Sequence, residues 1–187
     1  MHVIDNIKTI HDGWGRFYLV TMKSPDGTEH LRQLEDHGNA TCVLPYDPER
    51  RLVTLVRQPR TGPLFAGADA LLLEAPAGVT DGEDPAEAAR REAMEETGLR
   101  LGDLEPAGAL WSMPGCATER MYLYLAAYGA EDRIGDGGGV EHEGEEIEVV
   151  EMPAAEAAAM LADGRIADMK TAFLIQTLRL KRPDLFA

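Results

Sequence analysis

Residues 77–99 read AGVTDGEDPAEAARREAMEETGL and place a set of glutamates and an arginine behind a short loop that contains glycine. The second half of this stretch predicts a helix over residues 85–97, because it is rich in alanine, a strong helix former. Asp84 can cap the N-terminus of this helix, and Pro85 suits its first position. Gly98 supplies the stop, since glycine readily adopts the left-handed conformation that ends many helices. We therefore expect one well-delimited helix directly after the loop.

The glutamates of this stretch follow a helical spacing. Glu92 and Glu96 lie four residues apart, so they share one face of the helix. Glu95 comes one residue before Glu96, so it lies next to the same face of the helix. Glu83 lies just before the N-terminus of the helix, where the helix dipole favours an anion. A hard divalent cation such as Mg²⁺ would convert the repulsion between these carboxylates into coordination, because it prefers oxygen ligands together with substrate phosphates. A solvated acidic helix face is the alternative explanation of the same residues.

The same stretch matches the Nudix box, GX5EX7REUXEEXGU with U aliphatic, at Glu83, Arg91, Glu92, Glu95, Glu96 and Gly98. The chain therefore resembles a Nudix hydrolase. The sequence differs from the pattern at its first position. The pattern requires a glycine where this chain has Ala77, and the glycine of this chain, Gly78, follows one residue later. Ala93 is a small residue at the aliphatic position. The resemblance implies an α/β (α+β) fold, an α/β/α sandwich with a mixed sheet.

The resemblance also implies roles for these residues. The metal would be Mg²⁺, with Mn²⁺ as an alternative, and Arg91 would pair with a carboxylate of the box to fix its orientation. The implied catalytic residues are Arg91, Glu95, Glu96 and Glu145. The implied metal ligands are the carbonyl of Ala77 and the carboxylates of Glu92, Glu96 and Glu145. Glu145 lies in a segment with many acidic residues, so Glu143 is the substitute and His142 a further alternative as the base.

Segments outside the box resemble the nucleoside-diphosphate-sugar pyrophosphatase branch of the family. LLLEAPAG and LVRQPR resemble strands of that branch, and MPGCATE, GGGVE and IADMKT look closer to bacterial GDP-mannose pyrophosphatases. The substrate-binding residues that this implies are Arg60, Arg32, Gly78, Glu119 and Lys170, with Arg32 offered by the hairpin of a partner subunit. Without the box, Arg60 and Lys170 would be read as solvated surface charges, since Arg and Lys are mostly exposed.

The function implied is metal-dependent hydrolysis of GDP-mannose to GMP and mannose 1-phosphate. ADP-ribose or another ADP-sugar is the alternative substrate, because guanine and adenine differ only in the hydrogen bonds of their edges. A nucleotide-sugar sensor without catalysis is the alternative from another class, since a fold does not guarantee a function. The intact set of carboxylates argues against the sensor.

Composition and charge restrict the partners. The chain has 187 residues, of which 44% are hydrophobic, enough for one domain with a substantial core. Its formal net charge of -15 argues against long nucleic acids, which bind through basic residues. The N-terminus lacks a cationic start followed by an apolar block, and no run reaches transmembrane length. We expect a cytoplasmic homodimer that binds a nucleoside diphosphate sugar, and neither nucleic acid nor membrane.

The rest of the chain alternates strands and helices. Residues 16–24 and 29–36 flank the turn SPDG and predict a hairpin, so residues 1–40 are expected to form a dimerising β-hairpin region and residues 41–187 the Nudix domain. Further strands are expected at 40–47, 51–60, 71–76, 106–115, 120–128 and 147–153. Helices are expected at 153–164 and 169–182. Residues 129–146 are rich in glycine and acidic residues, so we expect a lid or active-site loop that is too polar to pack.

Overall fold

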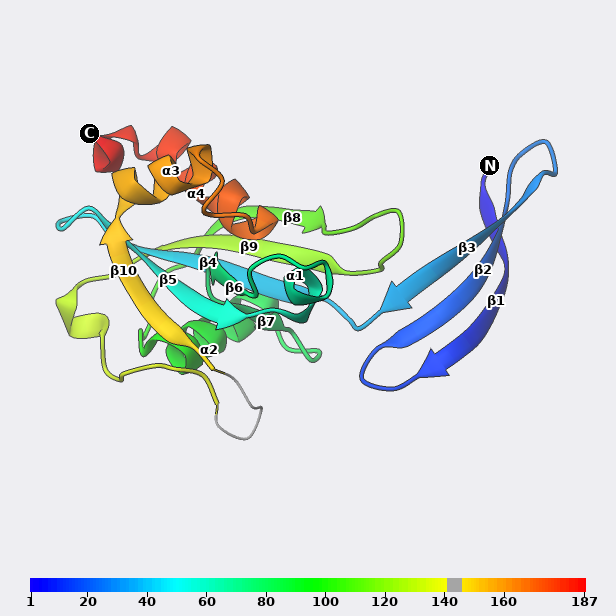
Figure 1. Ribbon diagram of the computed structural model, residues 1–187, viewed down its shortest axis with the longest axis horizontal. Coiled ribbons are helices and arrows are strands. Elements are labelled where there is room, and N and C mark those ends of the chain that lie inside the picture. Colours follow the sequence, from blue (N-terminus) through cyan, green and yellow to red (C-terminus); the bar gives the residue numbers. More distant parts are fainter. Residues whose placement is uncertain (141–145) are drawn as a thin grey trace.

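The computed structural model describes residues 1–140 and 146–187, which form two separate β-sheets and the helices that cover the larger one (Figure 1). The strands are β1 Val3–Asp12, β2 Arg16–Lys23, β3 Glu29–Asp36, β4 Ala40–Asp47, β5 Leu52–Pro59, β6 Leu71–Glu74, β7 Ala77–Val79, β8 Glu105–Trp111, β9 Arg120–Ala127 and β10 Glu148–Pro153. The helices are α1 Thr61–Phe65, α2 Pro85–Thr97, α3 Ala154–Ala162 and α4 Met169–Lys181, with short 3₁₀ turns at Ala130–Asp132 and Pro183–Phe186.

The N-terminal sheet is antiparallel and contains the predicted hairpin of β2 and β3 together with β1, a strand that the sequence did not predict. β1 pairs with β2 from Val3 to Asp12, but its register shifts twice, between Ile4 and Asn6 and again between Thr9 and His11. Each bulge reverses the alternation of side chains along the strand. The apolar residues of β1 therefore show no period of two, and a pattern search misses the strand.

The larger sheet has the strand order β10-β5-β4-β9-β8, with β6 beside β5 and β7 beside β4. β4 runs parallel to β9 and antiparallel to its other partners, so the sheet is mixed, as predicted. β4 and β5 pair only at Tyr46–Val53 and Asp47–Leu52. Beyond that point they separate, and β6 and β7 pair with them instead. Because β4 and β5 separate, β7, which begins the loop of the Nudix box, can pair with β4 and join the sheet.

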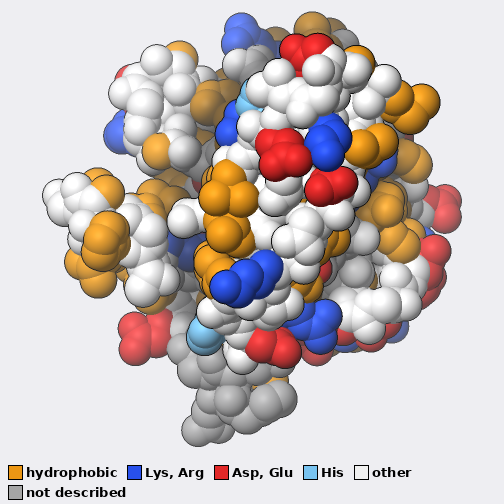
Figure 2. All heavy atoms as spheres, turned by 90° about the vertical axis from the view of Figure 1, so that its right-hand side faces the viewer, with side chains coloured by type: hydrophobic (Ala, Val, Ile, Leu, Met, Phe, Trp, Pro, Cys, Tyr) orange, Lys and Arg blue, Asp and Glu red, His pale blue; other side chains and the backbone are white. Residues whose placement is uncertain are grey.

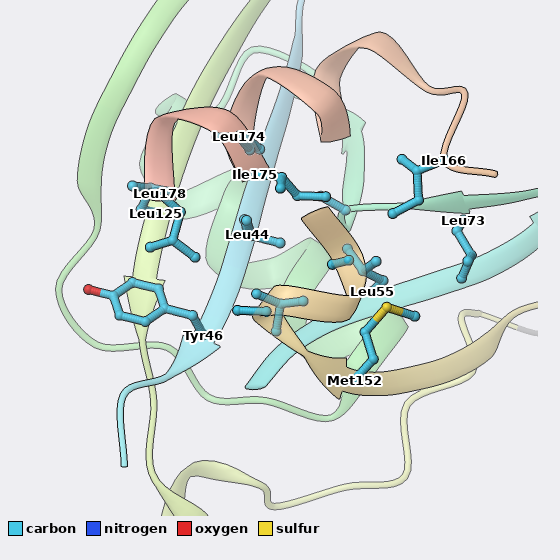
Figure 3. Packing of buried hydrophobic residues seen from close by; sticks show 14 of the residues in the cluster. Leu44, Tyr46, Leu55, Leu73, Leu125, Met152, Ile166, Leu174, Ile175 and Leu178 are labelled. Atoms are coloured by element: carbon cyan, nitrogen blue, oxygen red, sulfur yellow. The ribbon is translucent and has the colours of Figure 1, made fainter. Parts of the chain in front are cut away.

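Helices cover both faces of this sheet, with α2 on one side and α3 and α4 on the other (Figure 1). β4 is buried along its whole length, as expected for a strand covered on both faces. Leu44 packs with Leu174 of α4 in the larger core (Figure 3), whereas Val43 packs with Ala89 and Ala93 of α2. The small Ala93 thus lies in the contact between the box helix and the sheet. The arrangement confirms the predicted α/β/α sandwich.

The box helix α2 has the predicted bounds, Pro85–Thr97. The side chain of Asp84 accepts hydrogen bonds from the backbone N–H groups of Ala86, at 2.9 Å, and Glu87, at 3.3 Å. Gly98 ends the helix with a φ of 69°. A side chain here would also overlap the backbone of Gly135, so glycine is required by space as well as by conformation.

The acidic segment after β9 corrects one expectation. Residues 129–140 are packed rather than too polar to pack: the backbone N–H groups of Gly138 and Gly139 donate to the carbonyls of Glu96 and Glu95 at 2.9 and 3.0 Å. Glycine makes this possible because it lets two backbones approach closely. These bonds satisfy carbonyls at the C-terminal end of α2 that the helix itself leaves unpaired. Residues 141–145, which include the predicted Glu145 and its alternatives Glu143 and His142, lie outside the described residues.

Among the helices of residues 1–140 and 146–187, none combines the length and the apolar character needed to cross a membrane.

Candidate active site

The carboxylates of Glu92 and Glu96 face β7, the strand that begins the box loop. Their side chains are almost fully buried, with residue exposures of 8% and 1%. Glu96 accepts a hydrogen bond from the backbone N–H of Ala77 at 3.2 Å. A Cβ atom on Gly78 would lie 2.6 Å from Oε2 of Glu92 and closer still to the rest of that carboxylate. Only glycine therefore lets the loop backbone approach Glu92 so closely.

Arg91 binds the acidic side chains around it. Its guanidinium donates to Glu83 at 3.3 Å, to Glu95 at 3.0 Å and to the backbone carbonyl of Val79 at 3.2 Å, and it lies 2.9 Å from Oε1 of Glu92. Burial disfavours the charged guanidinium, but the attraction of Glu92, Glu83 and Glu95 outweighs burial and raises the pKa of Arg91. Arg91 therefore fixes the orientation of the box carboxylates and stays charged.

The residues present fit a divalent metal ion of the hard class. Glu92 and Glu96 converge on the backbone of Ala77 and Gly78, so two carboxylates meet a stretch of main chain where Gly78 has no room for a Cβ. Mg²⁺ is commonly bound through one or two carboxylates and completes its octahedron with water and substrate phosphates. Within the described residues, no group of three or more His, Cys, Asp or Glu side chains could hold a metal by itself. The site therefore suits an ion that is bound jointly with a phosphorylated substrate.

A second cluster of charges, from β5, β6 and α4, lies beside this group. Glu74, with 1% of its surface exposed, accepts from Arg60 Nε at 2.8 Å and from Arg60 Nη2 at 3.0 Å, and it also accepts from Lys170. Lys170 lies 3.0 Å from Oδ1 of Asp168 as well. Burial alone would raise the pKa of Glu74, but the hydrogen bonds from Arg60 and the charge of Lys170 lower it, so this carboxyl stays ionised.

A cavity of about 520 Å³ joins the two clusters. It is lined by Trp14, His37, Ala40, Arg60, Ala77, Gly78, Val79, Glu92, Ser112, Met113, Glu119, Met121, Asp168, Met169 and Lys170. A volume in this range fits a small-molecule site. The cations of Arg60 and Lys170 and the carboxylate of Glu92 thus border one space, which suits a ligand with both phosphates and a metal ion.

The end of the cavity toward the N-terminal sheet is aromatic and polar. The ring of Trp14 stacks on His37 with 5.2 Å between the ring centroids. Nε2 of His37 lies 3.0 Å from Oε1 of Glu119, and the Oγ atom of Ser112 is buried without a partner among the described residues. An aromatic face with hydrogen-bonding groups around it is suited to a base or a sugar.

The structure brings together most of the residues that the sequence singled out. Arg60, Gly78, Glu119 and Lys170 line the cavity together with Ala77 and Glu92, while Arg91, Glu95 and Glu96 lie directly beside it on α2. Arg32 lies on β3 of the N-terminal sheet, where it is exposed and donates only to the carbonyl of Leu31 in the described residues. Arg32 is therefore not part of the cavity of its own chain.

Sequence reasoning did not single out three residues of this region: Glu74, His37 and Asp168. Glu74 stands inside LLLEAP, where it read as part of a strand. The available signal was a charged residue in an otherwise apolar strand, because a buried carboxylate requires a partner.

Known proteins resemble the chain over most of its length. Residues 36–172 match the model of the NUDIX domain. The chain belongs to the Nudix family. The GDP-mannose pyrophosphatase of Cronobacter sakazakii is 41% identical over 165 residues, which cover 88% of this chain and 85% of the relative. The GDP-mannose pyrophosphatase of Klebsiella pneumoniae is 36% identical over 184 residues, covering 96% of this chain and 91% of the relative.

A solved structure, described as a crystal structure of ADP compounds hydrolase, superposes on this Nudix chain with a TM-score of 0.78. It covers 98% of this chain and 95% of its own, at 20% identity, so it supports the fold alone. Together these findings confirm the predicted family resemblance and the fold class. They also confirm the enzyme class, a hydrolase of phosphoric anhydrides.

Proposed function

We propose that this Nudix hydrolase cleaves the diphosphate bond of a nucleoside diphosphate sugar, GDP-mannose, to give GMP and mannose 1-phosphate with Mg²⁺. The observation that carries the proposal is that Arg60 and Lys170 border the same cavity as Glu92 and Gly78. The GDP-mannose pyrophosphatases that resemble the chain over most of its length support this substrate.

The charges of the cavity suit a diphosphate. The chain carries a formal net charge of -15, so a substrate with two or more negative charges needs local cations to bind. Arg60 and Lys170 supply them in the lining of the cavity, and Glu92 and the carbonyl of Ala77, with Glu96 beside them, would hold the metal. A metal ion held there would supply neutralisation of the phosphate charge and a lowered pKa of the attacking water.

The remaining residues take supporting roles in this proposal. Arg91 keeps Glu92 and Glu95 in place through its hydrogen bonds and its ion pair. Glu119 binds the nucleoside or the sugar at the polar end of the cavity. Glu145 completes the metal site or takes the proton of the water, with Glu143 as the substitute, because a carboxylate within hydrogen-bonding reach of a metal-bound water can act as a general base.

The test is to measure the release of monophosphate from GDP-mannose and ADP-ribose in parallel, with Mg²⁺, with Mn²⁺ and with EDTA. We expect turnover of GDP-mannose with Mg²⁺, none with EDTA, and a loss of about 10²-fold or more in kcat for Glu96→Gln, as for removal of a group that stabilises the transition state. Faster turnover of ADP-ribose would favour the ADP-sugar alternative. Binding of both sugars without any turnover would refute the hydrolase and support the sensor.

We also propose that the chain acts as a cytoplasmic homodimer joined through the N-terminal sheet, which stands apart from the rest of the molecule (Figure 1). Ile7, Val20 and Arg32 lie opposite one another on adjacent strands, so they share one face of this sheet. Ile7 and Ile4 are exposed, and Figure 2 shows hydrophobic side chains among charged ones on this side of the molecule.

A three-stranded sheet with exposed apolar residues is stabilised by a covering surface, and a second copy of the sheet supplies one. In a dimer of this kind Arg32 would reach the partner subunit's cavity. Sedimentation at micromolar concentration should give the mass of a dimer, and a monomer would refute this part of the proposal. Arg32→Ala should raise KM without changing the dimer.

A further inference from the structure

Glu74 is a buried carboxylate outside the Nudix box. It ends β6, and 1% of its surface is exposed. Taking an ionised carboxylate out of water is costly unless it is paired and hydrogen-bonded. The pairing here is bidentate and charge-assisted, because both Glu74 oxygens accept from the guanidinium of Arg60, at 2.8 and 3.0 Å. Lys170 donates to the same carboxylate.

The two cations that Glu74 joins come from distant parts of the chain. Arg60 directly follows β5, fourteen positions before Glu74, and Lys170 is in the first turn of α4, ninety-six positions after it. Both cations line the cavity, whereas in the described part of the chain Glu74 lies behind them and is absent from the lining. Each has a long, flexible side chain that by itself would occupy many rotamers. The shared carboxylate restricts both at once.

We propose that Glu74 is a positioning residue, which holds Arg60 and Lys170 as a pair aimed at the diphosphate of the substrate. This inference rests on the proposed function, since it assumes that the cavity binds a diphosphate. The bidentate contact with Glu74 uses Nε and Nη2 of Arg60, which leaves the Nη1 amino group of this cavity-lining residue outside the contact. Preorganised cations lose little entropy when the ligand arrives.

The surroundings of Glu74 fix the second cation as well. Thr171, the residue after Lys170, accepts a hydrogen bond through Oγ1 from the backbone N–H of Ala75 at 2.7 Å. Asp168 caps α4 by accepting from the N–H of Thr171 at 2.9 Å, and it lies 3.0 Å from Nζ of Lys170. The first turn of α4 is thus bound to the backbone next to Glu74. This attachment fixes the position of the Lys170 backbone relative to the carboxylate of Glu74.

A rival explanation makes the opposite prediction. If Glu74 acted only through its charge, it would repel the phosphates, and its removal would tighten the binding of an anion. If Glu74 positions the two cations, its removal loosens that binding although the site becomes more positive. The sign of the change in affinity therefore separates the two explanations.

The experiment compares Glu74→Gln with Asp47→Asn as a matched control. Asp47 is also a buried carboxylate, and it accepts from the guanidinium and the backbone of Arg50, but it lies outside the cavity described above. The probe is GDP in EDTA, measured by calorimetry, so that no turnover occurs. We expect E74Q to bind GDP about tenfold more weakly or worse, as for the loss of a charge-assisted hydrogen bond, and D47N to bind like the wild type.

Kinetics add a readout that general loss of structure would not produce. With GDP-mannose and Mg²⁺, we expect KM of E74Q to rise about tenfold while kcat stays within about threefold of the wild type, because ground-state and transition-state binding are lost alike. Thermal unfolding of both variants shows whether they are folded. Equal or tighter binding of GDP by E74Q, or an equal loss in D47N, would overturn the proposal.

Arg60→Lys keeps the test decisive where E74Q does not fold. This variant preserves the positive charge but removes the planar fork that binds both oxygens of Glu74. We expect GDP to bind about tenfold more weakly, as for the loss of a bidentate contact, and unchanged binding would overturn the proposal. A wild type that binds GDP but does not hydrolyse GDP-mannose would refute the proposed function only, since the binding comparison does not depend on turnover.

Discussion

Replacing Gly78 by alanine should disable the enzyme while leaving it folded. The added Cβ would lie 2.6 Å from Oε2 of Glu92 and closer to the other atoms of that carboxylate, whereas ordinary contact begins at about 3.5 Å. Glu92 must therefore move by about 1 Å, and a misplacement of this size costs about 10²-fold in rate, or about 2.7 kcal/mol of transition-state stabilisation. The stability cost is about 1 kcal/mol, because the group that must move is the end of a flexible side chain.

The assay is kcat with GDP-mannose across a Mg²⁺ titration, together with the thermal unfolding midpoint. Gly102→Ala is the control, since a Cβ at Gly102 would meet no atom within 4 Å and the residue does not have a positive φ. We expect G102A to match the wild type in both measurements. A G78A variant with wild-type kcat and wild-type Mg²⁺ dependence would refute the assignment of Glu92 and β7 to the metal site.

Three further outcomes concern stability. Leu174→Ala should lower the free energy of unfolding by about 2–5 kcal/mol in urea titrations, because Leu174 is fully buried in the larger core, and a loss below about 1 kcal/mol would contradict that packing. Gly98→Ala should also destabilise, since it adds a side chain at a φ of 69° against the backbone of Gly135; an unchanged unfolding midpoint would show that this approach is looser than described. The pKa of Glu74 is lower in the folded state, so the stability it contributes is fully present above its unfolded pKa of about 4.5 and is lost as the pH falls through the lowered value. Urea unfolding from pH 7 to about pH 3 should therefore show a shallower acid loss in E74Q than in the wild type, and equal slopes would argue against the ion pair with Arg60.

The box helix α2 is an element whose bounds and acidic face can be predicted from local sequence alone. Asp84, Pro85 and Gly98 act on backbone groups within a few residues of themselves, so the bounds of α2 could be predicted without the rest of the fold. The spacing of Glu92 and Glu96 likewise places both on one helix face wherever the helix lies. β1 shows the limit of the same reasoning, because its two bulges remove the alternation from which a strand is predicted.

The sequence by itself determined the box helix, its caps, the carboxylates it presents and the general order of strands, because these depend on short-range hydrogen bonds and on the periodicity of apolar residues. Only the tertiary structure decided that Glu74 joins Arg60 and Lys170, and that the acidic segment after β9 packs its glycines against the end of α2. These contacts link residues from fourteen to ninety-six positions apart. Their formation depends on how β5, β6 and α4 pack, and no local pattern encodes that packing.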